Sequence, residues 1–149
     1  MKEFVVPSVM RAWARIARVK ERLHSAVEQD LKREGLPPLE WYDVLLELSR
    51  MPDGRMPPRE LEQAVLLAQY NLSRLLDRLE EKGLIRRVNF PGDKRRQLVA
   101  ITAEGRRLRE KMWPAYTASI HEHAGSRLTE AEAEKLFILL GKLVESSHH

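Results

Sequence analysis

Cysteine is absent from this chain of 149 residues. Without a thiol the chain can form no disulfide, no thiolate zinc site and no cysteine-based redox sensor. Long hydrophobic runs are missing as well, since Lys2 and Glu3 precede only a short apolar run at residues 4–6. We therefore expect no signal peptide, no membrane-spanning segment and no membrane partner, with the cytoplasm as the default location.

Motifs that specify catalysis are also missing. The sequence has no glycine-rich phosphate-binding loop, no HExxH pattern and no spaced cluster that would pair a nucleophile with its base. His121-Glu122-His123 could suggest a regulatory metal site, but residues two apart do not share a helix face, which favours a solvated helix end. We expect no enzyme, no catalytic residue, no cofactor and no metal.

Positive charge exceeds negative charge only slightly. The 26 Lys and Arg residues against 22 Asp and Glu residues give a net charge of +4, which favours an anionic partner but proves little by itself. The length fits one domain, or a compact DNA-reading module with an oligomerisation arm, and two full domains are not expected.

Apolar residues recur at helical spacing near both ends of the chain. From about residue 8 to about residue 34 they repeat every three or four positions, which predicts a long amphipathic helix. Thr129-Glu130-Ala131-Glu132 is a capping-box pattern, and it opens a last helix with a broad apolar face. So short a chain cannot cover both apolar faces well, and we expect them to pair with a second copy in a homodimer. The alternative is a monomer in which both helices pack on the central part.

Shorter elements are expected between these ends. Apolar periodicity predicts helices that contain residues 41–48, 58–65 and 72–79, and a further helix after Thr102 that includes Pro114. Between the third and fourth of these helices the period changes, which predicts a β-hairpin. The expected fold is mainly α with a small β-hairpin wing, a winged helix-turn-helix with N- and C-terminal dimerisation helices.

The predicted hairpin is strongly basic. Residues 84–88 and 97–101 are apolar or β-branched and flank a tip at residues 89–96. Residues 86–96 carry five cations and one carboxylate, a net charge of +4 that equals that of the whole chain; they are Arg86, Arg87, Lys94, Arg95 and Arg96 with Asp93. This segment suits a phosphate backbone or a narrow minor groove, and the alternative is a solvated basic turn.

The helix over residues 72–79 is the predicted recognition helix. Its leucines point inward and leave polar side chains on the outer face. Arginine can bind guanine through two hydrogen bonds, Asn and Gln can read adenine, and Ser suits a phosphate contact. The candidate DNA contacts on this helix are Gln69, Tyr70, Asn71, Ser73, Arg74 and Arg78. The alternative is an ordinary solvated helix face.

The sequence resembles the MarR family of bacterial regulators in several segments. These are LSRLLDRLEEKGLIRR at 72–87, DKRR at 93–96 and ITAEG at 101–105, followed by LTEAE at 128–132 with the closing leucine-rich helix. Two departures precede the recognition helix and affect its turn: Ala68 stands where many relatives have Ser or Thr, and Leu66 replaces the usual glycine.

The resemblance implies a triangular dimer that binds a pseudo-palindromic operator in duplex DNA. The expected division is a dimerisation helix at 1–35, a winged helix-turn-helix domain at 36–103 and dimerisation helices at 104–149. The resemblance assigns Ser73, Arg74 and Arg78 to the recognition helix. In the wing, Asp93 would orient the turn, Arg95 would enter the minor groove, and Lys94 and Arg96 would add charge.

Many members of this family release DNA when they bind a small, often aromatic, effector. The resemblance makes Trp13, Trp41 and Tyr42 candidate lining residues, with ordinary core or interface packing as the alternative. The expected function is a homodimeric transcriptional repressor. The alternatives are a winged-helix protein-interaction module, for which an acidic or apolar wing would be the expected mark, and a small-molecule-sensing module without DNA binding.

Overall fold

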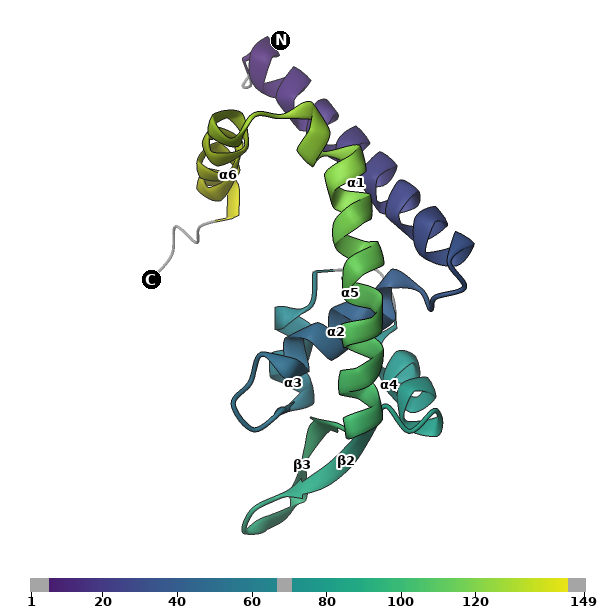
Figure 1. The fold of residues 1–149 in the computed structure, drawn as a ribbon. Helices are drawn as coiled ribbons and strands as arrows, with labels where there is room; N and C mark the ends of the chain where they lie inside the picture. Colours follow the sequence, from purple (N-terminus) through teal and green to yellow (C-terminus); the bar gives the residue numbers. More distant parts are fainter. Residues whose placement is uncertain (1–5, 67–70, 145–149) are drawn as a thin grey trace. The chain divides into compact units, whose positions relative to one another are not determined.

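The computed structural model describes residues 6–66 and 71–144 and is mainly helical, with one three-stranded antiparallel sheet (Figure 1). The helices are α1 (Pro7–Arg33), α2 (Leu39–Ser49), α3 (Pro58–Ala64), α4 (Leu72–Glu81), α5 (Ala103–His123), the 3-10 helix η1 (Gly125–Arg127) and α6 (Glu130–Val144). The strands are β1 (Arg55–Met56), β2 (Ile85–Phe90) and β3 (Asp93–Ile101). The expected fold class is confirmed.

The described residues form two compact units. The first, called the lobe below, comprises residues 30–115; the second, called the terminal unit, comprises the described parts of 1–29 and 116–149. The boundaries fall inside α1 and α5, whereas the sequence suggested boundaries after residues 35 and 103.

The core of the lobe lies where α2, α3 and α4 meet the sheet. The inward leucines of α4 and the apolar side chains of β2 and β3 are buried in one cluster with residues of α2 and α3: Val44, Leu45, Leu48, Leu61, Leu75, Leu76, Leu79, Ile85, Val99 and Ile101. Leu72 is partly buried against this cluster. The helical spacing read from the sequence therefore identifies the buried face of α4 correctly.

The hairpin differs from the expectation in its tip. Strand β3 begins at Asp93, which pairs with Phe90, so Pro91 and Gly92 form the turn and the prediction that all of residues 89–96 form the tip is wrong. The register shifts between this pair and the next one, Asn89 with Gln97, so residues 94–96 form an irregular part of β3. Gly92 has φ of 80°, and a glycine of positive φ after a proline is typical of a type II turn. The sequence also gave no sign of β1, whose two residues pair with Val99 and Ala100 of β3.

Helix α5 is fixed to the end of α4 by two residues of the ITAEG segment. The Thr102 hydroxyl donates to the carbonyl oxygen of Gly83 over 2.6 Å and accepts from the Gly105 N–H over 3.1 Å. A Cβ at position 105 would collide with the carbonyl oxygen of Leu84, so glycine allows α5 to pass this backbone closely. The start of α5 is thereby tied to the chain that leaves α4.

The terminal unit presents apolar side chains to solvent. The predicted capping box is confirmed, because the Glu132 N–H donates to Thr129 Oγ1 over 3.1 Å and the Thr129 N–H donates to Glu132 Oε1 over 2.9 Å. No described residue of α6 is buried within this chain. The exposed large apolar residues are Val6, Val9, Met10, Trp13, Ile16 and Val19 at α1 and Leu136, Phe137, Ile138, Leu139, Leu140, Leu143 and Val144 on α6. Across the described ranges, no helix has the length and hydropathy needed to cross a membrane.

Candidate nucleic-acid interface

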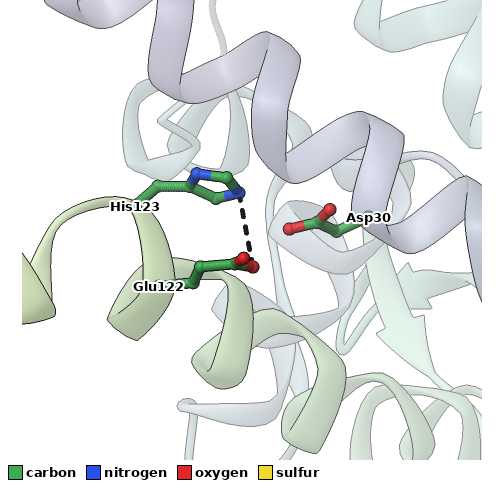
Figure 2. A group of neighbouring side chains, drawn as sticks. All are labelled: Asp30, Glu122 and His123. Carbon is green, nitrogen blue, oxygen red and sulfur yellow. Dashed lines mark ion pairs between the residues drawn. The ribbon is translucent and has the colours of Figure 1, made fainter.

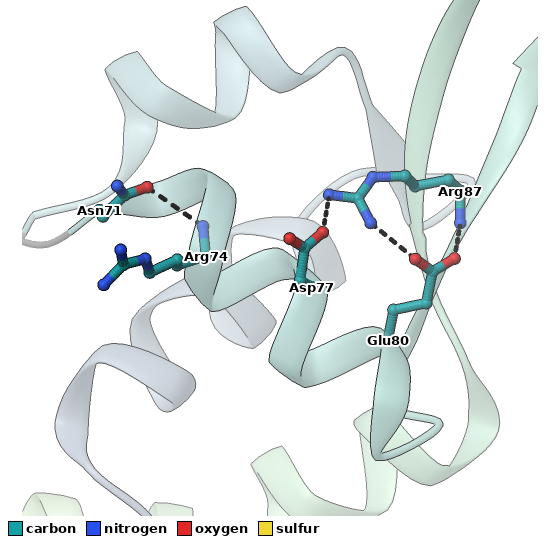
Figure 3. Close-up of polar contacts among 5 residues, drawn as sticks. All are labelled: Asn71, Arg74, Asp77, Glu80 and Arg87. Atoms are coloured by element: carbon teal, nitrogen blue, oxygen red, sulfur yellow. Dashed lines mark hydrogen bonds and ion pairs between the residues drawn. The ribbon is translucent and has the colours of Figure 1, made fainter.

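Helix α4 begins one residue after Asn71, which caps it. The side-chain Oδ1 of Asn71 accepts a hydrogen bond from the Arg74 N–H over 3.1 Å (Figure 3). This cap satisfies a free N–H group of the first helical turn. It leaves the side-chain NH2 of Asn71 for other partners, so the side chain cannot offer both groups to adenine while it caps the helix. Gln69 and Tyr70, the other predicted contacts near this end, and Ala68 lie outside the described residues.

The turn before α4 is tied to α2 by a residue that the sequence reasoning missed. Asp43 is 5% exposed, and its two carboxylate oxygens lie 3.1 and 2.9 Å from the Leu66 backbone nitrogen, whose N–H donates to them. A buried carboxylate requires such hydrogen bonds. These hydrogen bonds hold the backbone of the turn at Leu66, where the family usually has glycine. The sequence sign that could have identified this residue is that Asp43 stands between apolar and aromatic residues of α2.

The outer face of α4 carries mixed charge. Ser73, Arg74, Asp77 and Arg78 are all exposed, as predicted for this face. A hollow of about 500 Å³ lies along it, lined by Asn71, Arg74, Leu75, Asp77, Arg78 and Glu81 with Glu40 of α2. The helix holds two arginines and three carboxylates, so it is not basic by itself.

Arg87 of β2 contacts two of these carboxylates (Figure 3). Its Nη2 lies 3.0 Å from Asp77 Oδ1 and its Nη1 lies 2.6 Å from Glu80 Oε1, and its backbone N–H donates to Glu80 Oε2 over 3.3 Å. The Arg87 side chain is only 23% exposed. The count of free positive charge on the hairpin therefore has to be corrected, because Arg87 is paired with the acids of α4.

The wing fixes the backbone of one arginine while its side chain extends into solvent. Asp93 Oδ1 accepts from the Arg95 N–H over 3.0 Å and lies 3.8 Å from the Arg95 Nε, while the Arg95 side chain is 95% exposed. Lys94 beside it is exposed as well. The Arg96 guanidinium carbon lies 4.4 Å from the centre of the Phe90 ring, in a cation–π arrangement that orients the side chain.

Comparison with known proteins identifies this arrangement. A family model described as the MarR family matches residues 34–96. The uncharacterised HTH-type transcriptional regulator YkoM of Bacillus subtilis is 27% identical over 144 residues, which cover 97% of this chain and 91% of that protein. The crystal structure of AbsC, a MarR family transcriptional regulator from Streptomyces coelicolor, has a TM-score of 0.82 and 26% identity, with 95% of each chain covered. Residues 34–96 therefore match the MarR family, and the similarity to HTH-type and MarR family transcriptional regulators extends over most of the chain.

A second similar structure is that of a MarR family regulator bound to DNA. Sco3205 from Streptomyces coelicolor, solved in complex with DNA, has a TM-score of 0.79 and 25% identity, with 98% of this chain and 94% of that chain covered. MarR family members are transcriptional regulators and not enzymes, which confirms the expectation that this chain is not an enzyme.

The three aromatic residues that the MarR resemblance made candidate effector contacts have different surroundings. Tyr42 is buried on α2, and Trp41 packs against the core cluster of the lobe. Trp13 lies on α1 in the terminal unit and is 70% exposed. Trp41 and Tyr42 therefore take part in the packing of the lobe, whereas Trp13 belongs to the exposed apolar face of α1.

A cavity of about 590 Å³ lies within the terminal unit. Six of its lining residues are apolar and three can carry positive charge: Val19, Leu23, Ala26, Ala124, Leu128 and Leu136 with Arg22, His123 and Arg127. No carboxylate of the described residues forms an ion pair with Arg22 or Arg127. Sequence periodicity could not indicate this cavity, because it depends on how α1, α5, η1 and α6 pack together.

The end of α5 carries the histidines that the sequence reasoning considered for a metal. His123 Nε2 lies 3.8 Å from Glu122 Oε2. Figure 2 marks this ion pair with a dashed line. Asp30, drawn in the same figure, belongs to the other compact unit. Glu122 is exposed, whereas the His123 side chain is 26% exposed and lines the cavity of the terminal unit.

Proposed function

We propose that this chain is a MarR family regulator that binds duplex DNA and represses transcription by occupying promoter DNA. The observation that carries the proposal is that helix α4 and the β2–β3 hairpin, which lie in the same lobe, both present exposed arginines. Helix α4 presents exposed Arg74 and Arg78, and the neighbouring hairpin presents Arg95 on a backbone anchored by Asp93. A recognition helix suits the major groove, and an extended arginine suits a narrow minor groove. The relative Sco3205, crystallised with DNA, supports the same assignment.

The proposed contacts divide by chemistry. Arg74 and Arg78 would read base edges or phosphates, Ser73 would contact phosphate, and the free amide group of Asn71 would donate to DNA. Gln69 and Tyr70 stay predictions of the sequence. In the wing, Asp93 would position Arg95 for the minor groove, and Lys94 and Arg96 would add attraction to phosphate.

We propose further that the protein acts as a homodimer through its terminal helices. The exposed apolar residues of α1 and α6 support this assignment, because monomeric proteins rarely leave large contiguous apolar surfaces exposed. MarR family regulators are dimeric. Residues 1–35 and 104–149 would then serve dimerisation and residues 36–103 DNA binding, with two lobes on a pseudo-palindromic operator.

Selection of bound fragments from random duplex DNA tests the function. The expected result is two related half-sites whose centres are about 34–36 Å apart, one helical turn of DNA. Binding should weaken about 10³- to 10⁵-fold between 50 and 200 mM salt if about six to ten phosphates are contacted. Failure to enrich any sequence at low salt would favour a winged-helix protein-interaction module. If sedimentation showed that the protein binds the selected duplex as a monomer, the proposed dimer would be contradicted.

The cavity of the terminal unit supports a second proposal, that a small effector with an apolar body and an acidic group releases the DNA. Its apolar lining suits the body of such a ligand, and Arg22 and Arg127 suit the acidic group. Benzoate is a suitable probe, with benzyl alcohol as the uncharged control. Benzoate should raise the melting temperature of the free protein, and Arg127→Gln should reduce that shift. Equal shifts with both compounds, or none, would contradict the proposal.

A further inference from the structure

Acidic side chains lie on the helix that is proposed to enter DNA. Asp77 lies three residues after Arg74 and lines the same hollow, and residues three apart are neighbours on a helix surface. An unpaired Asp77 would repel phosphate, and it would also be free to form an ion pair with Arg74. Either event would weaken DNA binding through α4. The structure has to keep this carboxylate occupied for Arg74 to remain available.

Strand β2 supplies the group that does so. Side chains of a strand alternate between its two faces, so Arg87 lies on the same face as the buried Ile85, and the Arg86 side chain between them is exposed. The direction that carries Ile85 into the core beside α4 therefore carries Arg87 to Asp77 and Glu80. Two different guanidinium nitrogens are used, one for each carboxylate (Figure 3).

We propose that Arg87 is a positioning residue for DNA binding, which holds Asp77 and Glu80 away from the DNA contacts and fixes α4 to the wing strand. The inference rests on the proposed DNA-binding function. It separates Arg87 from Arg95, since Arg87 is 23% exposed and contacts two carboxylates of α4, whereas the Arg95 side chain is 95% exposed and its Nε lies 3.8 Å from Asp93 Oδ1 on its own strand. Arg87 acts through Arg74 and through the orientation of α4, and it does not itself contact DNA.

Binding of variants to the selected duplex tests the proposal. Arg87→Gln should weaken binding about tenfold or more, because two carboxylates lose their partner close to the DNA. Asp77→Asn with Glu80→Gln should recover most of that loss in the Arg87→Gln background and should improve binding much less in the wild-type background. Arg86→Gln is the matched control, since it removes the same charge from the same strand and leaves both ion pairs intact.

The salt dependence separates positioning from direct contact. A residue that contacts one phosphate contributes about one unit to the slope of log affinity against log salt. Arg87→Gln should leave this slope nearly unchanged, whereas Arg95→Gln should reduce it. A reduced slope in Arg87→Gln, together with equal effects of the carboxylate substitutions in both backgrounds, would overturn the proposal and make Arg87 a phosphate contact.

A measurement on the free protein keeps the inference separate from the proposed function. Arg87→Gln and Glu80→Gln should each lower the melting temperature, and the double variant should lower it by less than the sum of the two. Additive shifts would show that the Arg87 and Glu80 side chains are not coupled and would overturn the proposed role of this ion pair in fixing α4 to β2. If the wild-type chain bound no DNA while the shifts were non-additive, the proposed function and the role of Arg87 in DNA binding would fail, and only the structural ion pair would stand.

Discussion

Replacement of Gly105 by alanine tests the junction between α4 and α5. Alanine normally stabilises a helix relative to glycine, by about 0.5–1 kcal/mol. At this position, however, the added Cβ would collide with the Leu84 carbonyl oxygen and would lie 2.8 Å from Ile101 Cγ1. We therefore expect the substitution to destabilise the protein, opposite to its usual effect in a helix.

The size of this effect follows from how firmly the Leu84 carbonyl group is held. Its oxygen accepts from the Thr102 N–H over 3.1 Å, and the Leu84 N–H donates to the Leu79 carbonyl oxygen over 3.0 Å. The backbone cannot move away without loss of these hydrogen bonds. Overpacking of this kind costs about 1–3 kcal/mol. A net loss of about 2 kcal/mol would lower the melting temperature of a chain of this size by about 4–8 °C.

Thermal unfolding followed by circular dichroism measures this loss, with Gly141→Ala as the control. Gly141 lies within α6, and a Cβ there would meet no atom within 4 Å in this chain, so this variant should be as stable as the wild type or slightly more stable. DNA affinity should fall in Gly105→Ala, because the displaced segment follows directly on α4. A melting temperature of Gly105→Ala at or above that of the wild type would refute the reasoning.

Three further predictions concern the lobe. Asp43→Ala should cost about 1.5–3 kcal/mol in urea unfolding, because the Leu66 N–H loses a charged acceptor, and Asp43→Asn should cost less. Burial raises the pKa of Glu47, so the wild-type protein loses stability as Glu47 ionises with rising pH. Glu47→Gln should therefore gain stability relative to the wild type between pH 4 and pH 7. A constant difference in melting temperature over this range would contradict the prediction. Arg74→Ala should lose about 1–3 kcal/mol and relax preference at one base pair, whereas Arg95→Ala should weaken binding most beside A·T-rich flanks; equal loss beside G·C-rich flanks would make the wing a general phosphate clamp.

Periodicity predicted the elements that the lobe is built from. The leucines of α4 recur at three- and four-residue spacing, and a helix buries one face, so their burial followed from the sequence alone. The first helix, expected at about residues 8–34, spans Pro7–Arg33, and Gly35 after it has φ of 71°. Glycine tolerates this left-handed conformation, which is why it marks helix ends.

The start of β3 at the tip of the wing was harder to predict because its residues are mostly charged. Residues 93–96 are polar and lack the apolar alternation that marks a half-buried strand, yet they belong to β3. Of these residues only Asp93 pairs with β2, and the register shifts between this pair and the next one, Asn89 with Gln97, so residues 94–96 form an irregular part of the strand. Contacts between elements were equally invisible: nothing in the spacing of Asp43 and Leu66, or of Arg87 and Asp77, indicates that they meet.

The positions of charge along α4 give a physical reason for the arginine on β2. Glu80 and Glu81 lie in the last turn together with Arg78, and the partial negative charge of the helix dipole there favours the arginine and disfavours the two acids. The Arg87 guanidinium offsets this cost at Glu80, and the same contact neutralises Asp77 in the middle of the helix. The opposite end of α4 has the favourable partial positive charge and carries Arg74 in its first turn, so this end suits a phosphate or base edge. One arginine on the wing strand can thus stabilise the end of α4 that carries Glu80 and leave the opposite end free for the proposed contact with DNA.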